Sequence, residues 1–221
     1  MSGNSGSAMV LTTRGVTLAR NGRPIASLPD VDLAPGRSLA ILGASGSGKS
    51  TALLALAGIR APAGGEIAVG GIALWRLPVY QRDRFRGQRI GLVFQKFHII
   101  DAVSVADNLA LAARCAGVRS RPDRIASLLG RLGIADIARR RADRISHGQA
   151  QRVAVARALV NGPAVVLADE PTSALDDGHA ASMLALLKET AAAEGAGLVI
   201  ATHDRRVIDA VDATVSMAGA A

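Results

Sequence analysis

The stretch RSLAILGASGSGKST, residues 37–51, decides the fold. Its first half is an apolar run typical of a buried strand, and its second half carries the pattern G-x-x-x-x-G-K-[ST]. Glycines let the backbone curl so that successive amides surround phosphate groups, and a helix is expected from Lys49 to Gly58. The alternative is an ordinary glycine-rich turn, which the lysine and the Ser-Thr pair disfavour. The stretch therefore predicts a nucleotide-binding loop between a strand and a helix.

Each residue of this loop has an expected role. Lys49 would reach the β- and γ-phosphates, and the Ser50 hydroxyl would coordinate Mg²⁺. The residues expected to bind the nucleotide here are Gly43, Ser45, Gly46, Ser47, Gly48, Lys49, Ser50 and Thr51.

Length and composition fit one generous core with a small subdomain. The chain has 221 residues, of which 49% are hydrophobic and only 2% aromatic, so aliphatic side chains must fill the interior. That favours helices packed on a buried parallel sheet. The net charge of +8 allows three interpretations: a nucleic-acid partner, the anionic inner face of a membrane, or a solvated arginine-rich surface. The arginines are scattered and not interleaved with aromatics, so charge alone does not choose.

The termini and the cysteine give weaker expectations. Residues 1–9, MSGNSGSAM, are predicted to be a disordered tail before a single domain over residues 10–221. The chain shows no apolar run near the roughly 20 residues of a membrane span and no signal peptide. The single cysteine, Cys115, excludes an internal disulfide, fits a reducing compartment and is expected to be a small buried hydrophobe.

The order of elements predicts an α/β core with a helical insert. Short strands are expected around residues 15–19, 25–33 and 66–74. Continuous apolar runs at 89–94 and 164–169 are typical of strands covered on both faces. The chain between about 97 and 144 has helical periodicity, at 104–117 and 122–133. A helix at 177–193, a strand at 197–202, a short helix and a last strand at 213–218 follow.

Polar residues end three of these strands. Asp169 and Glu170 follow a buried strand, where Asp169 can hold Mg²⁺ and Glu170 can orient or deprotonate a water; the alternative is a solvated strand end. Gln95 alone would be a surface glutamine, and His203 alone is usually structural, although at the same edge it could touch a γ-phosphate or polarise water. His98 and His179 are expected at the surface. No His/Cys cluster exists, so no transition metal is expected.

A second phosphate-facing helix start is expected in RISHGQAQR, residues 144–152. A hydroxyl and a glycine stand at a helix N-terminus, where backbone amides favour an anion. Ser146 could equally cap its own helix, and both roles can hold at once. It is unusual for one small chain to carry two such helix ends about a hundred residues apart.

Taken in order, GASGSGKST, the Gln95 of VFQ, ISHGQAQR, VVLADEPTSALD and the His203 of ATHD resemble the ATP-binding subunit of ABC transporters. The resemblance implies a P-loop NTPase core with a mainly parallel sheet, an N-terminal antiparallel β subdomain and a helical subdomain inserted at about 97–160. It implies a Mg²⁺-dependent ATPase that binds ATP, works as a homodimer or pseudo-dimer and serves an integral-membrane permease subunit, with no nucleic acid. The protein would be cytoplasmic and peripheral on the inner membrane through that partner.

The resemblance also assigns residues. Ser146, Gly148 and Gln149 would face the γ-phosphate bound by the partner copy, and residues 173–176 would form a loop in which Asp176 crosses the dimer interface. Glu170, His203 and Gln95 would be catalytic, with Gln95 also sensing Mg²⁺ beside Ser50 and Asp169. Arg20 stands where an aromatic residue usually stacks on adenine, and a guanidinium plane can stack on a base too.

Three departures and a finer likeness complete the comparison. Ile145 and His147 replace the first and third residues of the usual L-S-G-G-Q, Ala142 replaces a common proline, and the adenine aromatic is absent. Residues 86–111 resemble the subgroup serving lipoprotein release, macrolide export and the cell-division ABC complex, which move a membrane protein mechanically. Two other classes remain open: a soluble ABC-type ATPase acting on nucleic acid or as a scaffold, and a non-catalytic binding module, against which Lys49, Asp169, Glu170 and His203 speak.

Overall fold

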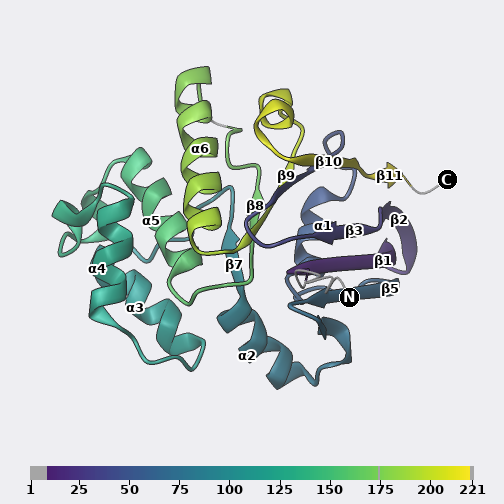
Figure 1. Cartoon of the computed structure of the whole chain (residues 1–221), viewed down its shortest axis with the longest axis horizontal. Helices are drawn as coiled ribbons and strands as arrows, with labels where there is room; N and C mark the ends of the chain where they lie inside the picture. The colour runs from purple at the N-terminus through teal and green to yellow at the C-terminus, as the bar shows by residue number, and fades with distance from the viewer. Residues whose placement is uncertain (1–8, 174, 220–221) are drawn as a thin grey trace, which may run out of the picture.

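The computed structural model describes residues 9–173 and 175–219 and contains two sheets. Figure 1 shows the helices α3 to α5 on one side, the antiparallel strands on the other, and α6 standing between them over the parallel strands. Most of the predicted tail, residues 1–8, lies outside the described residues, as does Ala174 of the predicted interface loop.

The parallel sheet is the centre of the molecule. Its strand order is β10-β4-β9-β8-β7, and every pairing in it is parallel. The strands are β4 (Ser38–Leu42), β7 (Ile90–Val93), β8 (Val165–Asp169), β9 (Gly197–Thr202) and β10 (Ala213–Ser216). Strand β9 is buried along its whole length, as a strand covered by helices on both faces should be. The predicted apolar runs therefore form this sheet.

The antiparallel sheet is built mostly from the N-terminal third. Its order is β11-β2-β1-β5-β6, with β3 also pairing with β1. The strands are β1 (Leu11–Arg20), β2 (Arg23–Leu28), β3 (Val31–Leu33), β5 (Gly64–Val69), β6 (Ile72–Ala73) and β11 (Ala218–Gly219). The predicted single strand at 25–33 is in fact two strands separated at Pro29-Asp30, because proline lacks the amide that a ladder needs. The predicted strand at 66–74 is likewise a hairpin that turns at Gly70-Gly71, both at positive φ.

Six α-helices and four short 3₁₀ segments occupy the rest of the described chain. The helices are α1 (Lys49–Leu56), α2 (Val79–Arg89), α3 (Val105–Cys115), α4 (Pro122–Arg131), α5 (His147–Leu159) and α6 (Asp177–Ala193). The 3₁₀ segments are η1 (Leu74–Arg76), η2 (Ala135–Ile137), η3 (Ala142–Arg144) and η4 (Arg205–Ala210). None of the helices in this described part is long and apolar enough to cross a bilayer. Sequence reasoning missed α2, which buries none of its residues and so carries no apolar stripe.

Cys115 is exposed, which corrects the expectation of a buried hydrophobe. It is the last residue of α3, whose buried apolar residues are Val105, Leu109 and Ala113. Two residues beyond Ala113 is about 200° around a helix, so Cys115 faces away from these residues. His98 and His179 are exposed, as predicted.

An ion cluster ties the helical layer to α6. Arg124 and Arg131 of α4 both pair with Glu194, which follows α6 and whose side chain is 9% exposed. Arg124 also donates to the carbonyl of Leu159 at the end of α5. Burial raises the pKa of Glu194, but the two guanidinium groups outweigh it and hold that pKa below its usual value. Glu194 thus joins the end of α6 to α4, and Arg124 extends the connection to α5.

The packing of β7 against α5 predicts that Gly91→Ala is destabilising. A Cβ at Gly91 would lie 2.4 Å from the carbonyl oxygen of Ala158, and a backbone atom cannot move aside cheaply. We expect a loss of about 1–3 kcal/mol in the free energy of unfolding, measured by urea denaturation. The control is Gly130→Ala inside α4, where a Cβ meets nothing within 4 Å and should stabilise the helix by up to about 1 kcal/mol. Equal unfolding midpoints for the two variants would contradict this packing.

Candidate active site

The register of the parallel sheet assembles the site. Leu42 pairs with Thr202, and Ala201 pairs with Asp169, so three strands end together at one edge. The phosphate loop follows β4, Glu170 follows β8 and His203 follows β9. In open parallel sheets, ligands bind outside this carboxyl edge.

A pocket of about 410 Å³ lies at this edge. Its lining residues are Arg20, Ile25, Ser45, Gly46, Gly48, Lys49, Ser50, Thr51, Gln95, Glu170, Ser173 and His203. Ten of these were expected from the sequence to bind nucleotide or to act in catalysis; Ile25 and Ser173 were not. The structure therefore brings residues from six separate parts of the chain into one pocket.

The phosphate loop is held in shape by its own backbone and by Lys49. Gly48 sits at φ 94° as the N-cap of α1, a conformation that other residues rarely adopt. The ammonium of Lys49, which is 6% exposed, donates to the carbonyl oxygens of Gly43 at 2.8 Å and Ala44 at 3.0 Å. Space at Gly43 is tight, because a Cβ there would lie 2.3 Å from Ser47 Oγ and would force that hydroxyl to move. The Ser47 hydroxyl is itself buried without a hydrogen-bond partner among the described residues.

Asp169 is a half-buried residue at the end of β8. Its Oδ1 atom has no hydrogen-bond partner within the described part of the chain, and it lines a small cavity next to Ser50. Burial raises its pKa, and the Ser50 hydroxyl and the Lys49 charge act in the opposite direction. An unpaired buried carboxylate oxygen beside a hydroxyl is a donor set that suits a hard divalent cation. The pair thus fits Mg²⁺, whose charge would offset the cost of burying the carboxylate.

Glu170 is held by three neighbours. Its carboxylate accepts from Thr202 Oγ1 at 2.9 Å, lies 2.8 Å from His203 Nδ1 and is 3.7 Å from Lys49 Nζ. Its backbone is in the left-handed region at φ 46°, which costs a non-glycine residue about 1–2 kcal/mol. Several contacts to one strained residue fix the direction of its carboxylate.

Gln95 and the segment after Glu170 are in contact. Gln95 Nε2 donates to Ser173 Oγ at 3.1 Å, and Ser173 Oγ donates to the Glu170 carbonyl oxygen at 3.1 Å. On the other side of this segment, the buried Gln151 of α5 donates to the Pro171 carbonyl oxygen at 3.1 Å. The turn that follows β8 is therefore anchored from the segment after β7 and from α5.

The residues predicted to meet a partner lie elsewhere. Ser146, Gly148 and Gln149 do not line the pocket. They form the N-terminus of α5, where Ser146 Oγ accepts from the Gln149 amide and Gln149 Oε1 accepts from the Ser146 amide. This capping box confirms that Ser146 caps its own helix. Asp176, also expected at an interface, caps α6 and contacts His179.

Sequence reasoning missed several polar residues around Glu170. Thr202 and Thr172 are both fully buried, and Arg206 binds three carbonyl or carboxylate groups. A signal existed for Thr202, because a hydroxyl at the last position of a strand lies at the ligand-binding edge. No signal existed for the contacts of Arg206 with Leu175 and Asp177, because these acceptors are about 30 residues away in sequence.

The ABC transporter family model matches residues 28–173. The chain belongs to this family. A protein named an uncharacterized ABC transporter ATP-binding protein, from Mycobacterium tuberculosis, is 38% identical over 190 residues, which is 85% of this chain and 77% of the relative. The macrolide export ATP-binding/permease protein MacB of Agrobacterium fabrum is 39% identical over 85% of this chain, which spans only 29% of MacB.

Solved ABC structures agree with the fold. One is the dimeric ATP-binding cassette MJ0796 in a post-hydrolysis state bound to ADP and Pi. Its superposition on this chain has a TM-score of 0.80 with 30% sequence identity, and it covers 94% of this chain and 94% of the cassette. The mixed α/β architecture predicted from the sequence is therefore confirmed. The chain is an ATP-binding subunit of an ABC transporter, and its reaction is the hydrolysis of ATP to ADP and phosphate.

The contacts of Thr202 predict that Thr202→Val weakens the fold at the site. Valine has the same shape but cannot donate to Glu170 or accept from the Asp204 amide, a contact of 3.0 Å. Two buried polar groups would lose a partner, so we expect a loss of about 1–3 kcal/mol in unfolding free energy by urea denaturation. Thr202→Ser, which keeps the hydroxyl, should lose about 1 kcal/mol or less. A valine variant as stable as the serine variant would show that these bonds contribute little.

Proposed function

We propose that two cassettes, either two copies of this chain or one copy and a related cassette, close on ATP and that hydrolysis reopens them, moving a separate membrane protein. The observation that carries this proposal is the separation of the site into two parts. One copy gathers the phosphate loop, Glu170 and His203, while Ser146 and Gly148 stand at another helix start outside that pocket. A second copy supplies what the first lacks.

The N-terminus of α5 is suited to a phosphate from another copy. The capping box uses the amides of Ser146 and Gln149, whereas the first amides of a helix have no acceptor within the helix. Ser146, His147 and Gly148 are exposed, and even a Cβ placed on Gly148 would meet nothing within 4 Å. An anion is favoured at such an end by the aligned peptide dipoles. His147 is bulkier than the glycine usual at this position, but its ring packs against the Phe97 ring, with 5.0 Å between the ring centroids. Gly148 therefore stays accessible.

Each residue of the pocket has a proposed role in hydrolysis. Lys49 and the amides of residues 43–51 bind the β- and γ-phosphates, and Ser50, Asp169 and Gln95 hold Mg²⁺. The bound ion would neutralise charge on the phosphates as it does in other P-loop enzymes. Glu170 orients a water for in-line attack on the γ-phosphorus and takes its proton, while the bond from that phosphorus to ADP breaks. His203 fixes the Glu170 carboxylate and can contact the γ-phosphate.

Arg20 and Ile25 are proposed to contact the base. Both line the pocket beside Gly48, and the Ile25 side chain lies 3.7 Å from where a Gly48 Cβ would be. A guanidinium plane stacks on a purine without reading its edge, so the site would distinguish ATP from GTP less strongly than one built on specific hydrogen bonds.

The membrane partner is proposed to move mechanically, for the release of a lipoprotein or lipid or the export of a drug. Support comes from the resemblance of residues 86–111 to that subgroup and from the relationship to MacB. The chain would act at the cytoplasmic face of the membrane through this partner, without nucleic acid.

Replacing Glu170 by Gln should trap the ATP-bound dimer. Glutamine keeps the size of the side chain but cannot take a proton from water, so binding persists while turnover falls by at least about a hundredfold. Size-exclusion chromatography with light scattering in ATP should show twice the monomer mass. The control is Lys49→Ala in the same background, which removes the phosphate ligand and should stay monomeric. A monomer at saturating ATP would refute closure on ATP.

Replacing Ser146 by Asp should separate its two roles. Aspartate is as good an N-cap as serine, so the urea midpoint should stay near that of the unmodified chain. Its negative charge would repel a γ-phosphate, and the Glu170→Gln dimer should dissociate. Ser146→Asn, a neutral cap of the same shape, is the matched control and should dimerise more strongly. Equal dimerisation of the two variants would remove Ser146 from the shared site.

A further inference from the structure

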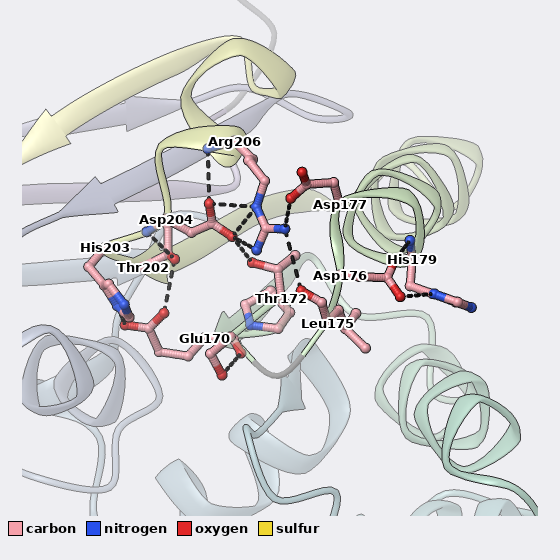
Figure 2. Close-up of polar contacts among 12 residues, drawn as sticks. Glu170, Thr172, Leu175, Asp176, Asp177, His179, Thr202, His203, Asp204 and Arg206 are labelled. Carbon is pink, nitrogen blue, oxygen red and sulfur yellow. Dashed lines mark hydrogen bonds and ion pairs between the residues drawn. The ribbon is translucent and has the colours of Figure 1, made fainter.

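A network of polar contacts lies beside the catalytic edge and is centred on Arg206 of η4. Figure 2 shows its guanidinium between Asp204 and Asp177, with Leu175 and Thr172 next to it. Nε and Nη2 donate to the Asp204 carboxylate at 2.7–3.0 Å, and Nη1 donates to Asp177 Oδ1 at 2.7 Å. Nη1 also reaches the Leu175 carbonyl oxygen at 3.4 Å. One side chain therefore spans two loops that are about 30 residues apart.

One end of this network leads to Glu170. Asp204 Oδ2 accepts from Thr172 Oγ1 at 2.7 Å, and the Asp204 amide donates to Thr202 Oγ1 at 3.0 Å. Thr202 in turn donates to the Glu170 carboxylate. Both threonines are fully buried, so these bonds have little competition from water. Asp204 is thus connected to Glu170 in two ways. Thr202 connects it to the Glu170 carboxylate, and Thr172 connects it to the backbone turn that follows Glu170.

The other end of the network holds the start of α6. Leu175 and Asp177 flank Asp176, the N-cap of α6, and Arg206 contacts both flanking residues. The same turn begins at Ser173, which receives the hydrogen bond from Gln95. The turn expected to face a partner cassette is therefore fastened to the turn that carries His203.

We propose that Arg206 is a positioning residue that makes residues 172–173 and 175–177 move as one unit with the 202–206 turn, so that closure of the dimer sets the direction of the Glu170 carboxylate. This inference rests on the proposed closure on ATP and goes beyond it, by naming the side chain that transmits it. Arg206 touches no substrate and acts through Asp204, Thr202 and Thr172.

An isolated surface ion pair would be the simpler explanation, and its typical contribution is about 0–1 kcal/mol. The geometry points further. The planar fork matches Asp204 with two parallel bonds and leaves Nη1 for the second loop, whereas a lysine ammonium is a point charge that cannot reproduce the paired bonds to Asp204. The Asp204 side chain is only 11% exposed, and the Arg206 guanidinium is the main reason why the pKa of Asp204 falls to about 2. The contact with Asp204 is therefore partly shielded and directional, whereas the contact with Asp177 is exposed, and one side chain makes both.

The experiment compares ATPase kinetics of Arg206→Met, Arg206→Lys and Arg205→Met. Methionine keeps an unbranched apolar stem but makes none of the polar contacts. We expect kcat to fall about tenfold or more with KM for ATP changed by less than about twofold, because phosphate binding is untouched while Glu170 loses its alignment. Lysine should restore part of kcat. Arg205 is the matched control, since it is exposed and, among the described residues, its side chain takes part in no hydrogen bond or ion pair.

A second variant guards against simple misfolding. Asp177→Asn alters only one arm of the network at a side chain that is 94% exposed, so the fold should keep its urea midpoint while kcat falls about twofold to fivefold. Unchanged kcat in Arg206→Met, or a loss matched by Arg205→Met, would overturn the proposal. So would a fall in kcat that tracks the urea midpoint across all variants. The dimer trapped by Glu170→Gln is scored separately: if it forms and these kinetics are unchanged, closure stands and the role of Arg206 does not.

Discussion

The register of three parallel strands is the constraint on which the site depends. Strand β9 lies between β4 and β8, and its last residue, Thr202, pairs with Leu42 while its Ala201 pairs with Asp169. A shift of one residue in either pairing would move a polar end by about 3.3 Å and turn its side chain to the opposite face. Phosphate loop, carboxylates and histidine would then no longer meet. The apolar side chains that fix this register are thus as necessary for function as the polar residues they position.

The carboxyl edge of the parallel sheet holds charged groups that are costly to bury, and the cost of burial is compensated differently for each group. Lys49 is compensated by loop carbonyls and by Glu170, whereas Asp169 keeps one oxygen that no described residue satisfies. Glu170 adds a left-handed backbone. Apolar residues at these positions would give a more stable fold, because buried polar groups without full partners cost free energy. The site therefore keeps its affinity for phosphate and cation at the expense of stability in the free chain.

Sequence patterns predicted the features that a short run of residues determines and missed those that depend on contacts between distant segments. The loop after β4, the carboxylates after β8 and the helix at Asp177–Ala193 each follow from a short run of residues. The break at Pro29-Asp30 was also local, yet the apolar run on both sides concealed it. By contrast, α2 carries no apolar stripe, the exposure of Cys115 depends on which face α3 presents, and Arg206 meets acceptors about 30 residues away. These features depend on how segments pack together, which the hydrophobic periodicity within one segment does not reveal.

Helix α5 connects the proposed second phosphate contact, at its N-terminus, with the loops around the pocket. Ser146 stands at the start of this helix. Five residues further along, Gln151 donates to the carbonyl oxygen of Pro171, the residue after Glu170. Near the end of the helix, Arg157 donates to the carbonyl oxygens of Phe97 and His98, which follow Gln95. Thirteen residues of helix form a rod about 20 Å long, stiff enough to carry a displacement from one end to the other. A force on Ser146 from a second cassette would therefore reach the loops around the local Glu170 and Gln95. Each site in a closed pair would be sensitive to the nucleotide in the other, because one helix in each copy contributes to both.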